Sequence, residues 1–464
     1  MSKLSIMDLA FFLTESDASP KHIGGLMMFR KPAKAPANFV QQAVEQYVGT
    51  ADDVGAPFNQ VINFTNLTGP CWETAINFDV KEHIHYHTLE GDDFRDSLYE
   101  LVGDLHGPIL SRDKPMWEMH VIEGIDDQRF ALYTKLHHAY ADGVTMSSIL
   151  AQSLSKSATE KTTSTMWAAL PKKRQENAAD SVSIMKALTK RGGRYTDYIR
   201  TLAGLSKLTA QLALESVHLT KNAVAVPFKG RPKTPLTGRV IEGRQFASAS
   251  VPMDKVNHLR QLTRSTLNHI ALTCIDGALH RYLQDCDADI DQPIAVQMPV
   301  NLRRKGDNSM GNKIGIVLVE LAKRTEDPYE RLREIGFTLR NVRYQIDGVP
   351  ATSVMAYTVL LGSFAQLAEM LRLENRVPPL GNTLISNVPG PNDQLYLKGA
   401  ALEEMYPISA LTPGNHLNIT IYSYNGRLQF GLVATSALPR MERLGDYIHE
   451  AFEDLEKAVT TPRP

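Results

Sequence analysis

The sequence has few cysteines, almost no net charge and no uninterrupted hydrophobic run of membrane-spanning character. Its 464 residues include three cysteines, Cys71, Cys274 and Cys286. Three unpatterned cysteines exclude a disulfide framework and indicate a reducing compartment. Fifty Lys and Arg stand against 51 Asp and Glu, a formal charge of -1, whereas a nucleic-acid-binding domain is normally clearly basic. We therefore expect a cytoplasmic globular protein that has no nucleic-acid partner.

Several sequence signatures are also missing. The sequence contains no GxSxG, no Walker lysine loop and no GxGxxG, so a serine hydrolase, a P-loop NTPase and a Rossmann oxidoreductase are poorly supported. Asp8 interrupts the short apolar run near the N-terminus, which argues against a signal peptide. The most hydrophobic uncharged stretch, residues 348–368, contains Pro350 and Gly362. This composition favours a buried core helix over a transmembrane span.

The near-zero charge conceals a local excess of positive charge. Residues 186–233 contain ten basic and two acidic residues, so their formal charge is +8 and that of the remaining chain is -9. Apolar side chains recur there at helical spacing, at Ile199, Leu202, Leu205, Leu208 and Leu212. Two interpretations are open: a helix packed on the protein with a solvated basic face, or an interfacial helix that meets anionic lipid headgroups.

The order of strand-like and helix-like patterns predicts an α/β (α+β) protein. Residues 1–150 and 240–464 each alternate the two patterns, and residues 151–239 read as a helical basic linker followed by an extended crossover. Asn425-Gly426 lies between two β-rich runs and predicts a type I′ hairpin. We therefore expect two domains with mixed sheets flanked by helices, joined by the linker.

The most informative segment is His137-His138-Ala-Tyr-Ala-Asp142-Gly143, between a predicted strand at 129–136 and a predicted helix at 144–154. Alternation along the strand turns His138 and His137 to opposite faces. A neutral imidazole, whose ordinary pKa is about 6.5, can take a proton from an alcohol. We expect Asp142 to fix the loop by pairing with an arginine or capping backbone amides, and Gly143 to permit a tight reversal. The alternative is a hydrogen-bonded core histidine pair at a strand end.

HHxxxDG resembles the signature of acyltransferases similar to chloramphenicol acetyltransferase and of peptide-synthetase condensation domains. Further segments narrow the resemblance to the bacterial wax ester synthase/diacylglycerol acyltransferase family. They are LSIMDLAFFLTES at the N-terminus, Pro115-Met116-Trp117-Glu118 with Met in place of the family's Leu, the crossover PKTPLTGRVIEGRQFA, Leu267-Asn268-His269 with His in place of Asp, and SNVPGP at 386–391.

The resemblance implies two chloramphenicol-acetyltransferase-like domains with an active site between them. It also implies transfer of an acyl group from coenzyme A to a long-chain alcohol or diacylglycerol, giving wax esters or triacylglycerols. In that scheme His138 is the general base, Asp142 holds the loop, and His137 and Gly143 shape the site. No cofactor is bound permanently, because acyl-CoA is a co-substrate.

The resemblance also suggests roles for residues outside the histidine motif. Asn268 and Asn387 match motif asparagines that can donate hydrogen bonds to the substrate or the oxyanion. Trp117 is predicted to be a core anchor rather than a substrate contact. The apolar segment from Val354 to Leu371 is expected to line the path of a long alkyl chain, with Val354, Leu360 and Leu361 as its representatives. A water-insoluble acceptor implies peripheral association with the inner membrane or lipid inclusions, and it puts the interfacial interpretation of the basic segment on an equal footing with the packed helix.

Three alternatives compete with this interpretation. His83, His85 and His87 alternate along a predicted strand and suggest zinc, but no cysteine or acidic cluster completes the set, so we predict no metal. His87 and Asp92 have the HxxxxD spacing of glycerolipid acyltransferases without a further motif of that family. A non-catalytic lipid-droplet or membrane-binding protein on the same scaffold, and a condensation-type enzyme using carrier-bound acyl groups, stay open.

Overall fold

The computed structural model describes residues 2–4, 6–66, 70–90, 94–160, 164–168, 234–288, 292–301, 314–323, 325–347, 349, 351–373, 377 and 379–461. The basic segment and most of the predicted helical linker lie outside the described residues. Whether that segment packs on the protein or meets lipid therefore stays a prediction.

One six-stranded sheet is built mainly from the N-terminal third of the chain. Its order is β12 (Tyr396–Leu397), β13 (Ala400–Ile408), β2 (His22–Arg30), β7 (Arg129–His137), β6 (Trp117–Asp126) and β5 (Ile84–Thr88). The pairs are antiparallel except β5 with β6. Helices cover both faces of β7, with α2 (Phe39–Val48) and α4 (Gly143–Gln152) on one and α3 (Phe94–His106) on the other. Almost every residue of β7 is consequently buried.

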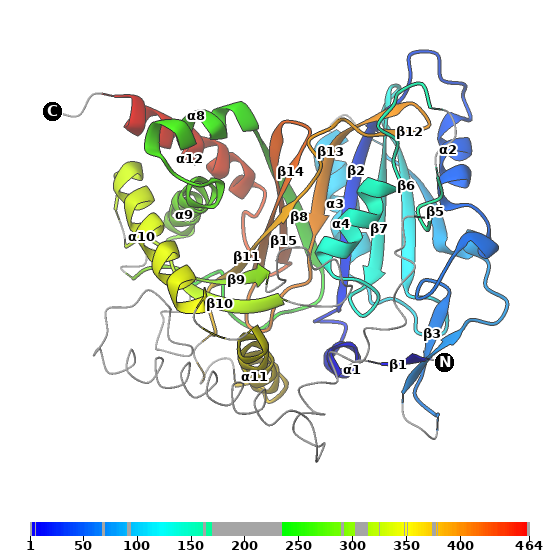
Figure 1. Ribbon diagram of the computed structural model, residues 1–464, viewed down its shortest axis with the longest axis horizontal. Coiled ribbons are helices and arrows are strands. Elements are labelled where there is room, and N and C mark those ends of the chain that lie inside the picture. The colour runs from blue at the N-terminus through cyan, green and yellow to red at the C-terminus, as the bar shows by residue number, and fades with distance from the viewer. Residues whose placement is uncertain are drawn as a thin grey trace.

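The other six-stranded sheet belongs to the C-terminal half. Its order is β10 (Ile314–Glu320), β9 (Ala295–Asn301), β11 (Thr383–Pro389), β14 (Leu417–Tyr424), β15 (Arg427–Thr435) and β8 (Arg244–Pro252). β11 is parallel to β9 and β14, and the other pairs are antiparallel. Four helices pack against the sheet on one side (Figure 1): α8 (Met253–Thr263), α9 (Leu267–Asp285), α10 (Pro328–Asp347) and α12 (Arg443–Thr460). Both halves are thus mixed sheets flanked by helices, as predicted.

The predicted hairpin in the second sheet is confirmed. Asn425 and Gly426 connect β14 to β15, and their φ angles are 44° and 69°. Positive φ at both central residues is what a type I′ turn requires, and asparagine and glycine adopt it at the least steric cost.

A small sheet and two helices complete the end of the molecule that is lowest in Figure 1. The sheet contains β1 (Ser2–Lys3), β4 (Cys71–Thr74) and β3 (Gln60–Asn63). The helices are α1 (Ile6–Thr14) and α11 (Ala351–Met370). α11 contains most of the hydrophobic stretch singled out in the sequence. No helix among the described residues is long and apolar enough to cross a membrane.

The C-terminal half supplies two strands to the N-terminal sheet, which the sequence did not predict. β12 and β13 lie within residues 240–464, yet β13 pairs with β2 of the N-terminal sheet. Without β13, β2 would expose a row of unpaired backbone groups at the edge of its sheet. A division of the chain at residue 240 therefore does not separate the two sheets.

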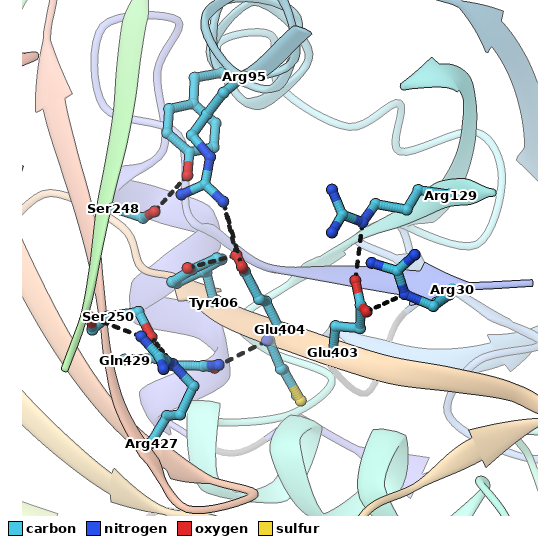
Figure 2. Close-up of polar contacts among 12 residues, drawn as sticks. Arg30, Arg95, Arg129, Ser248, Ser250, Glu403, Glu404, Tyr406, Arg427 and Gln429 are labelled. Carbon is cyan, nitrogen blue, oxygen red and sulfur yellow. Dashed lines mark hydrogen bonds and ion pairs between the residues drawn. The ribbon is translucent and has the colours of Figure 1, made fainter. Parts of the chain in front are cut away.

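Charged side chains reinforce this shared strand (Figure 2). Glu403 accepts hydrogen bonds from Arg30 of β2 and Arg129 of β7. Its neighbour Glu404 pairs with Arg95 of α3 at 3.2 Å and accepts the Tyr406 hydroxyl at 2.7 Å. Successive side chains of β13 thus bind elements of the N-terminal half on different sides of the strand.

Candidate active site

The HHxxxDG segment forms the turn from β7 to α4, as the sequence predicted. β7 ends at His137, whose N–H donates to the Met116 carbonyl at 2.9 Å. The N–H of His138 donates to the Lys21 carbonyl at 2.8 Å, just before β2 begins. Main-chain bonds to both neighbouring strands therefore fix the two histidines at the end of the sheet.

Asp142 starts α4 as its N-cap. Its Oδ1 accepts the N–H of Thr145 at 2.7 Å, which satisfies one of the unpaired donors at the helix start. Of the two roles considered for Asp142, capping is the one that this contact supports. Gly143 is the first residue of α4 and is not among the positive-φ glycines. The expectation that Gly143 permits a tight reversal is therefore wrong; instead, a Cβ at this position would meet no atom within 4 Å.

His138 is half-buried, with its ring stacked on Phe11 of α1 at 4.5 Å between centroids. Nδ1 is buried and has no hydrogen-bond partner among the described residues, which leaves Nε2 as the nitrogen that can face a substrate. Burial lowers the pKa of His138 below its ordinary value, and the negative charge of Asp142 only partly offsets this shift. The imidazole is therefore neutral and able to accept a proton at neutral pH.

His137 points the other way and is completely buried. Its ring stacks on Phe12 at 4.4 Å, its Nδ1 accepts the N–H of Ala139 at 3.1 Å, and its Nε2 lies 3.4 Å from Oε1 of Glu15. Both ring nitrogens thus face protein groups. His137 is enclosed by the protein and has no open side for a substrate.

Sequence reasoning missed the part that α1 plays in this site. Phe11 covers His138, Phe12 covers His137, and Glu15 follows the helix directly. The adjacent phenylalanines near the N-terminus are an apolar pair that could have indicated a buried contact. They lie more than a hundred residues before the motif, so the sequence does not show what they contact.

A buried group of charges lies beside His138. Burial lowers the pKa of Lys21 to about 8, against the opposing charges of Glu369 on α11 and of Glu15. Burial likewise lowers the pKa of Arg244, at the start of β8, to about 10, against the charge of Glu369. The end of α11 is therefore electrostatically linked to both sheets next to the histidines.

The two motif asparagines meet each other. Asn387 on β11 donates from Nδ2 to Oδ1 of Asn268, at the start of α9, over 2.6 Å. β11 also contacts α4, and Val388 lies in the same apolar cluster as Met146 of α4. The SNVPGP segment therefore lies against the helix that follows the histidines. A hydrogen bond from either asparagine to substrate stays a prediction.

Comparisons with known proteins identify the family of this chain. Residues 4–271 match the wax ester synthase/diacylglycerol acyltransferase catalytic domain, and residues 310–456 match the C-terminal domain of the same family. The chain belongs to this family. It is an acyltransferase with the predicted two-domain fold.

Relatives in this family match over nearly their whole length. A probable diacylglycerol O-acyltransferase of Mycobacterium tuberculosis is 33% identical, over 97% of this chain and 98% of that protein. The O-acyltransferase WSD of Acinetobacter baylyi is 29% identical, over 99% and 98%. The wax ester synthase/diacylglycerol acyltransferase of Marinobacter aquaeolei VT8 has a TM-score of 0.76 and 26% identity, over 99% and 100%. A condensation domain of the calcium-dependent antibiotic synthetase, at 14% identity and a TM-score of 0.59, shares the fold.

Trp117, in the segment that resembles the Pro-Leu-Trp motif of the wax ester synthase/diacylglycerol acyltransferase family, is a core residue. It is buried, its Nε1 donates to the Phe58 carbonyl at 2.9 Å, and its indole packs on Trp167 and His83. The prediction of a core anchor is confirmed.

The three α11 residues predicted to line an alkyl channel do not share one environment. Val354 and Leu361 are buried, whereas Leu360 is 61% exposed. Leu361 lies seven residues, about two turns, after Val354 and so shares its side of the helix, whereas Leu360 does not. The exposure of Leu360 does not favour an enclosed channel at this position, and the lining roles of all three residues stay predictions.

The histidines considered for zinc are divided between two structures. His83 ends a short 3₁₀ helix, Val80–His83, and its Nδ1 bonds to the Trp117 carbonyl at 2.8 Å. His85 stacks on His120, and His87 Nε2 lies 3.0 Å from His120 Nδ1. The expectation that all three lie on one strand face is wrong. No group of His, Cys, Asp or Glu within the described ranges is arranged to hold a metal ion.

Proposed function

We propose that the protein transfers a long-chain acyl group from coenzyme A to the hydroxyl of a fatty alcohol or diacylglycerol, with His138 as the general base. The observation that carries the proposal is the half-buried His138 ring, which has a lowered pKa and an enclosed Nδ1. Such a ring is neutral at neutral pH and can accept the proton of an alcohol at Nε2. Positioned base catalysis of this kind contributes about 10²–10⁴-fold.

The proposed reaction is a direct transfer. His138 takes the hydroxyl proton while the alcohol oxygen forms a bond to the thioester carbonyl carbon. The C–S bond then breaks, and the imidazolium returns the proton to the leaving thiolate of coenzyme A. An acyl-enzyme on Cys71 or Cys274 has little support, because both are buried and burial raises the pKa of Cys274 well above its ordinary value.

The acceptor is insoluble in water, so the enzyme must work at a lipid surface, and α11 offers one candidate contact. Leu360, Phe364, Leu367 and Leu371 are 49–61% exposed and follow one face of the helix. α11 and α1 lie at the same end of the molecule, and α1 covers the histidines (Figure 1). We assign this apolar row to peripheral contact with a membrane or lipid inclusion.

The catalytic proposal is tested with purified full-length protein, long-chain acyl-CoA and either hexadecanol or a diacylglycerol. His138→Ala and His120→Ala are compared, since His120 is also a buried imidazole of the same sheet. Ester formation by the wild type and by His120→Ala, with a loss of about 10²–10⁴-fold in kcat for His138→Ala, supports the proposal. An unimpaired His138→Ala variant contradicts it. Ester formation only from carrier-bound acyl groups selects the condensation-type alternative.

The lipid contact has a separate test in vesicle flotation. Leu360→Ser/Phe364→Ser is compared with Ile76→Ser, whose side chain is 89% exposed on the N-terminal half. Burying a large apolar side chain is worth about 1.5–3 kcal/mol, so the double variant should bind at least about tenfold more weakly. An unchanged vesicle-bound fraction would remove α11 from the proposed lipid contact.

A further inference from the structure

Glu15 is a buried carboxylate next to the histidines. Its side chain is only 1% exposed, although it directly follows α1. Oε1 accepts the N–H of Lys21 at 3.2 Å and lies 3.4 Å from His137 Nε2, and Oε2 accepts Nη2 of Arg112 at 2.9 Å. Burial alone would raise the pKa of Glu15, but its contacts with His137, Arg112 and Lys21 lower that pKa to about 2. The carboxylate is therefore ionised throughout the neutral range.

Glu15 lies beside the His137 ring. Nδ1 of that ring accepts the N–H of Ala139 at 3.1 Å, so the ring proton is on Nε2. Nε2 makes no hydrogen bond within the described part of the chain, and its contact with Glu15 Oε1 at 3.4 Å is electrostatic. Phe12 lies flat against the ring, with an angle of 12° between the planes. The imidazole is thus fixed by a hydrogen bond at Nδ1, by Phe12 on one face and by the charge of Glu15 beside Nε2. The carboxylate is the only charged member of this set.

The same carboxylate oxygen is also connected to His138 by two hydrogen bonds through the main chain of Lys21. Oε1 accepts the N–H of Lys21, and the carbonyl of Lys21 accepts the N–H of His138. A shift of Glu15 would therefore move two groups together: the ring of His137 and the main-chain partner of His138. Both shifts act on the segment that aims the His138 ring.

We infer that Glu15 is a positioning residue, which holds His137 and the main chain of His138 so that Nε2 of His138 faces the reacting hydroxyl. This inference rests on the proposed role of His138 as general base. A misplacement of about 1 Å in a catalytic group lowers the rate by about 10²-fold. Loss of the Glu15 charge should therefore reduce kcat rather than substrate binding.

A second glutamate–histidine pair in the same sheet provides a matched control. Glu118 Oε2 lies 3.6 Å from His120 Nε2. Burial would raise the pKa of Glu118, but its contact with His120 and the charge of Lys135 lower that pKa to about 2. Glu118 and Glu15 are therefore both ionised carboxylates beside a buried histidine, although Glu118 is more exposed. Glu15 lies beside His137 of the histidine motif, whereas Glu118 pairs with His120 of β6.

The test compares Glu15→Gln, Glu15→Asp and Glu118→Gln in the full-length protein, with kcat, both KM values and thermal melting measured for each. Glu15→Gln is expected to lower kcat by about 10- to 100-fold with KM unchanged within twofold. Glu15→Asp keeps the charge and should lose less. Glu118→Gln should keep the wild-type kcat, although its melting temperature falls.

Three results would overturn the inference: wild-type kcat in Glu15→Gln, an equal kcat loss in Glu118→Gln, or a loss confined to KM. If Glu15→Gln does not fold, Glu15→Asp decides the question: a lower kcat at constant KM supports positioning, and wild-type kcat overturns it. His138→Ala is assayed beside these variants. An active His138→Ala would refute the general base itself, whereas an inactive one with normal Glu15 variants would refute only the positioning role.

Discussion

The two halves of the molecule contain the same three-stranded unit, but only one half carries the histidines. β2, β7 and β6 form an antiparallel unit in the first sheet, and β8, β15 and β14 form one in the second. β7 and β15 both have nine residues. In the first unit His22 pairs with His137, and in the second Arg244 pairs with Thr435. Each central strand then leads to a helix, α4 or α12.

The ends of these two central strands differ in what their side chains do. β7 leads to the half-buried imidazole of His138. β15 ends at Thr435, whose hydroxyl donates to the Ile241 carbonyl at 3.1 Å, and the Ser436 hydroxyl donates to Glu242 at 2.7 Å. One strand end presents a proton acceptor, and the other closes a loop. The fold thus supplies two similar positions, and the side chains placed there decide which one does chemistry.

The largest effect expected from this comparison concerns His138 and its counterpart Ser436. Each is the first residue after its central strand. His138→Ala should lower kcat by about 10²–10⁴-fold, since the general base is lost. Ser436→Ala removes only a loop hydrogen bond, so kcat should stay at the wild-type value. Steady-state kinetics on both variants checks this, and a similar loss in both would mean that the two halves contribute equally.

The second largest difference is expected in stability, when the glycines at the start of the two following helices are replaced by alanine. A Cβ on Gly445 of α12 would lie 2.7 Å from the Ser248 carbonyl oxygen, whereas a Cβ on Gly143 of α4 meets nothing within 4 Å. Gly445→Ala should therefore destabilise the fold by about 1–3 kcal/mol. Gly143→Ala should be neutral or stabilise by about 0.4–1 kcal/mol. Denaturant unfolding measures both. Loss of activity in a stable Gly143→Ala would assign the open space beside the loop to substrate.

The N-caps of the same helices predict a smaller difference in stability. Asp142 accepts a hydrogen bond from Thr145, whereas Glu442, the N-cap of α12, makes no side-chain capping bond. Asp142→Ala should lower the free energy of unfolding by about 0.5–2 kcal/mol, and Glu442→Ala should change it little. Equal losses in the two variants would contradict the assignment of Asp142 as the cap.

The smallest expected effect is on pH dependence. Burial lowers the pKa of His138, so the base stays neutral down to pH values below 6.5, and kcat/KM should fall only below that pH. The charge of Asp142 raises this pKa, and the positive charge of Lys21 lowers it. Lys21→Met removes one positive charge, so the acid limb of the pH–rate profile should move to higher pH. A limb that stays in place or moves to lower pH would show that Lys21 does not act on His138.

Local patterns allowed the sequence to predict the chemistry-bearing segment. The strand, turn and helix around His138 and the Asn425-Gly426 hairpin each depend on a few adjacent residues. Their hydrogen-bonding and φ requirements follow directly from residue type.

Long-range contacts could not be predicted in the same way. Nothing in the N-terminal segment indicates that Glu15 contacts His137, since the pair is formed by chain closure over more than a hundred residues. The repeated three-stranded unit is equally hidden, because strand register depends on backbone pairing and on which face is buried, and different sequences satisfy both. His83 leaves the predicted strand for a 3₁₀ turn because its ring bonds to the Trp117 carbonyl.

The shared strand β13 affects how the protein folds while it is synthesised on the ribosome. β2 is completed by residue 30, but the strand that pairs with its other edge ends at Ile408. At translation rates of about 5–20 residues per second, that edge waits for tens of seconds. The nascent N-terminal half therefore emerges with an open sheet edge beside its histidines. A chain truncated before β13 should aggregate rather than yield a smaller working enzyme.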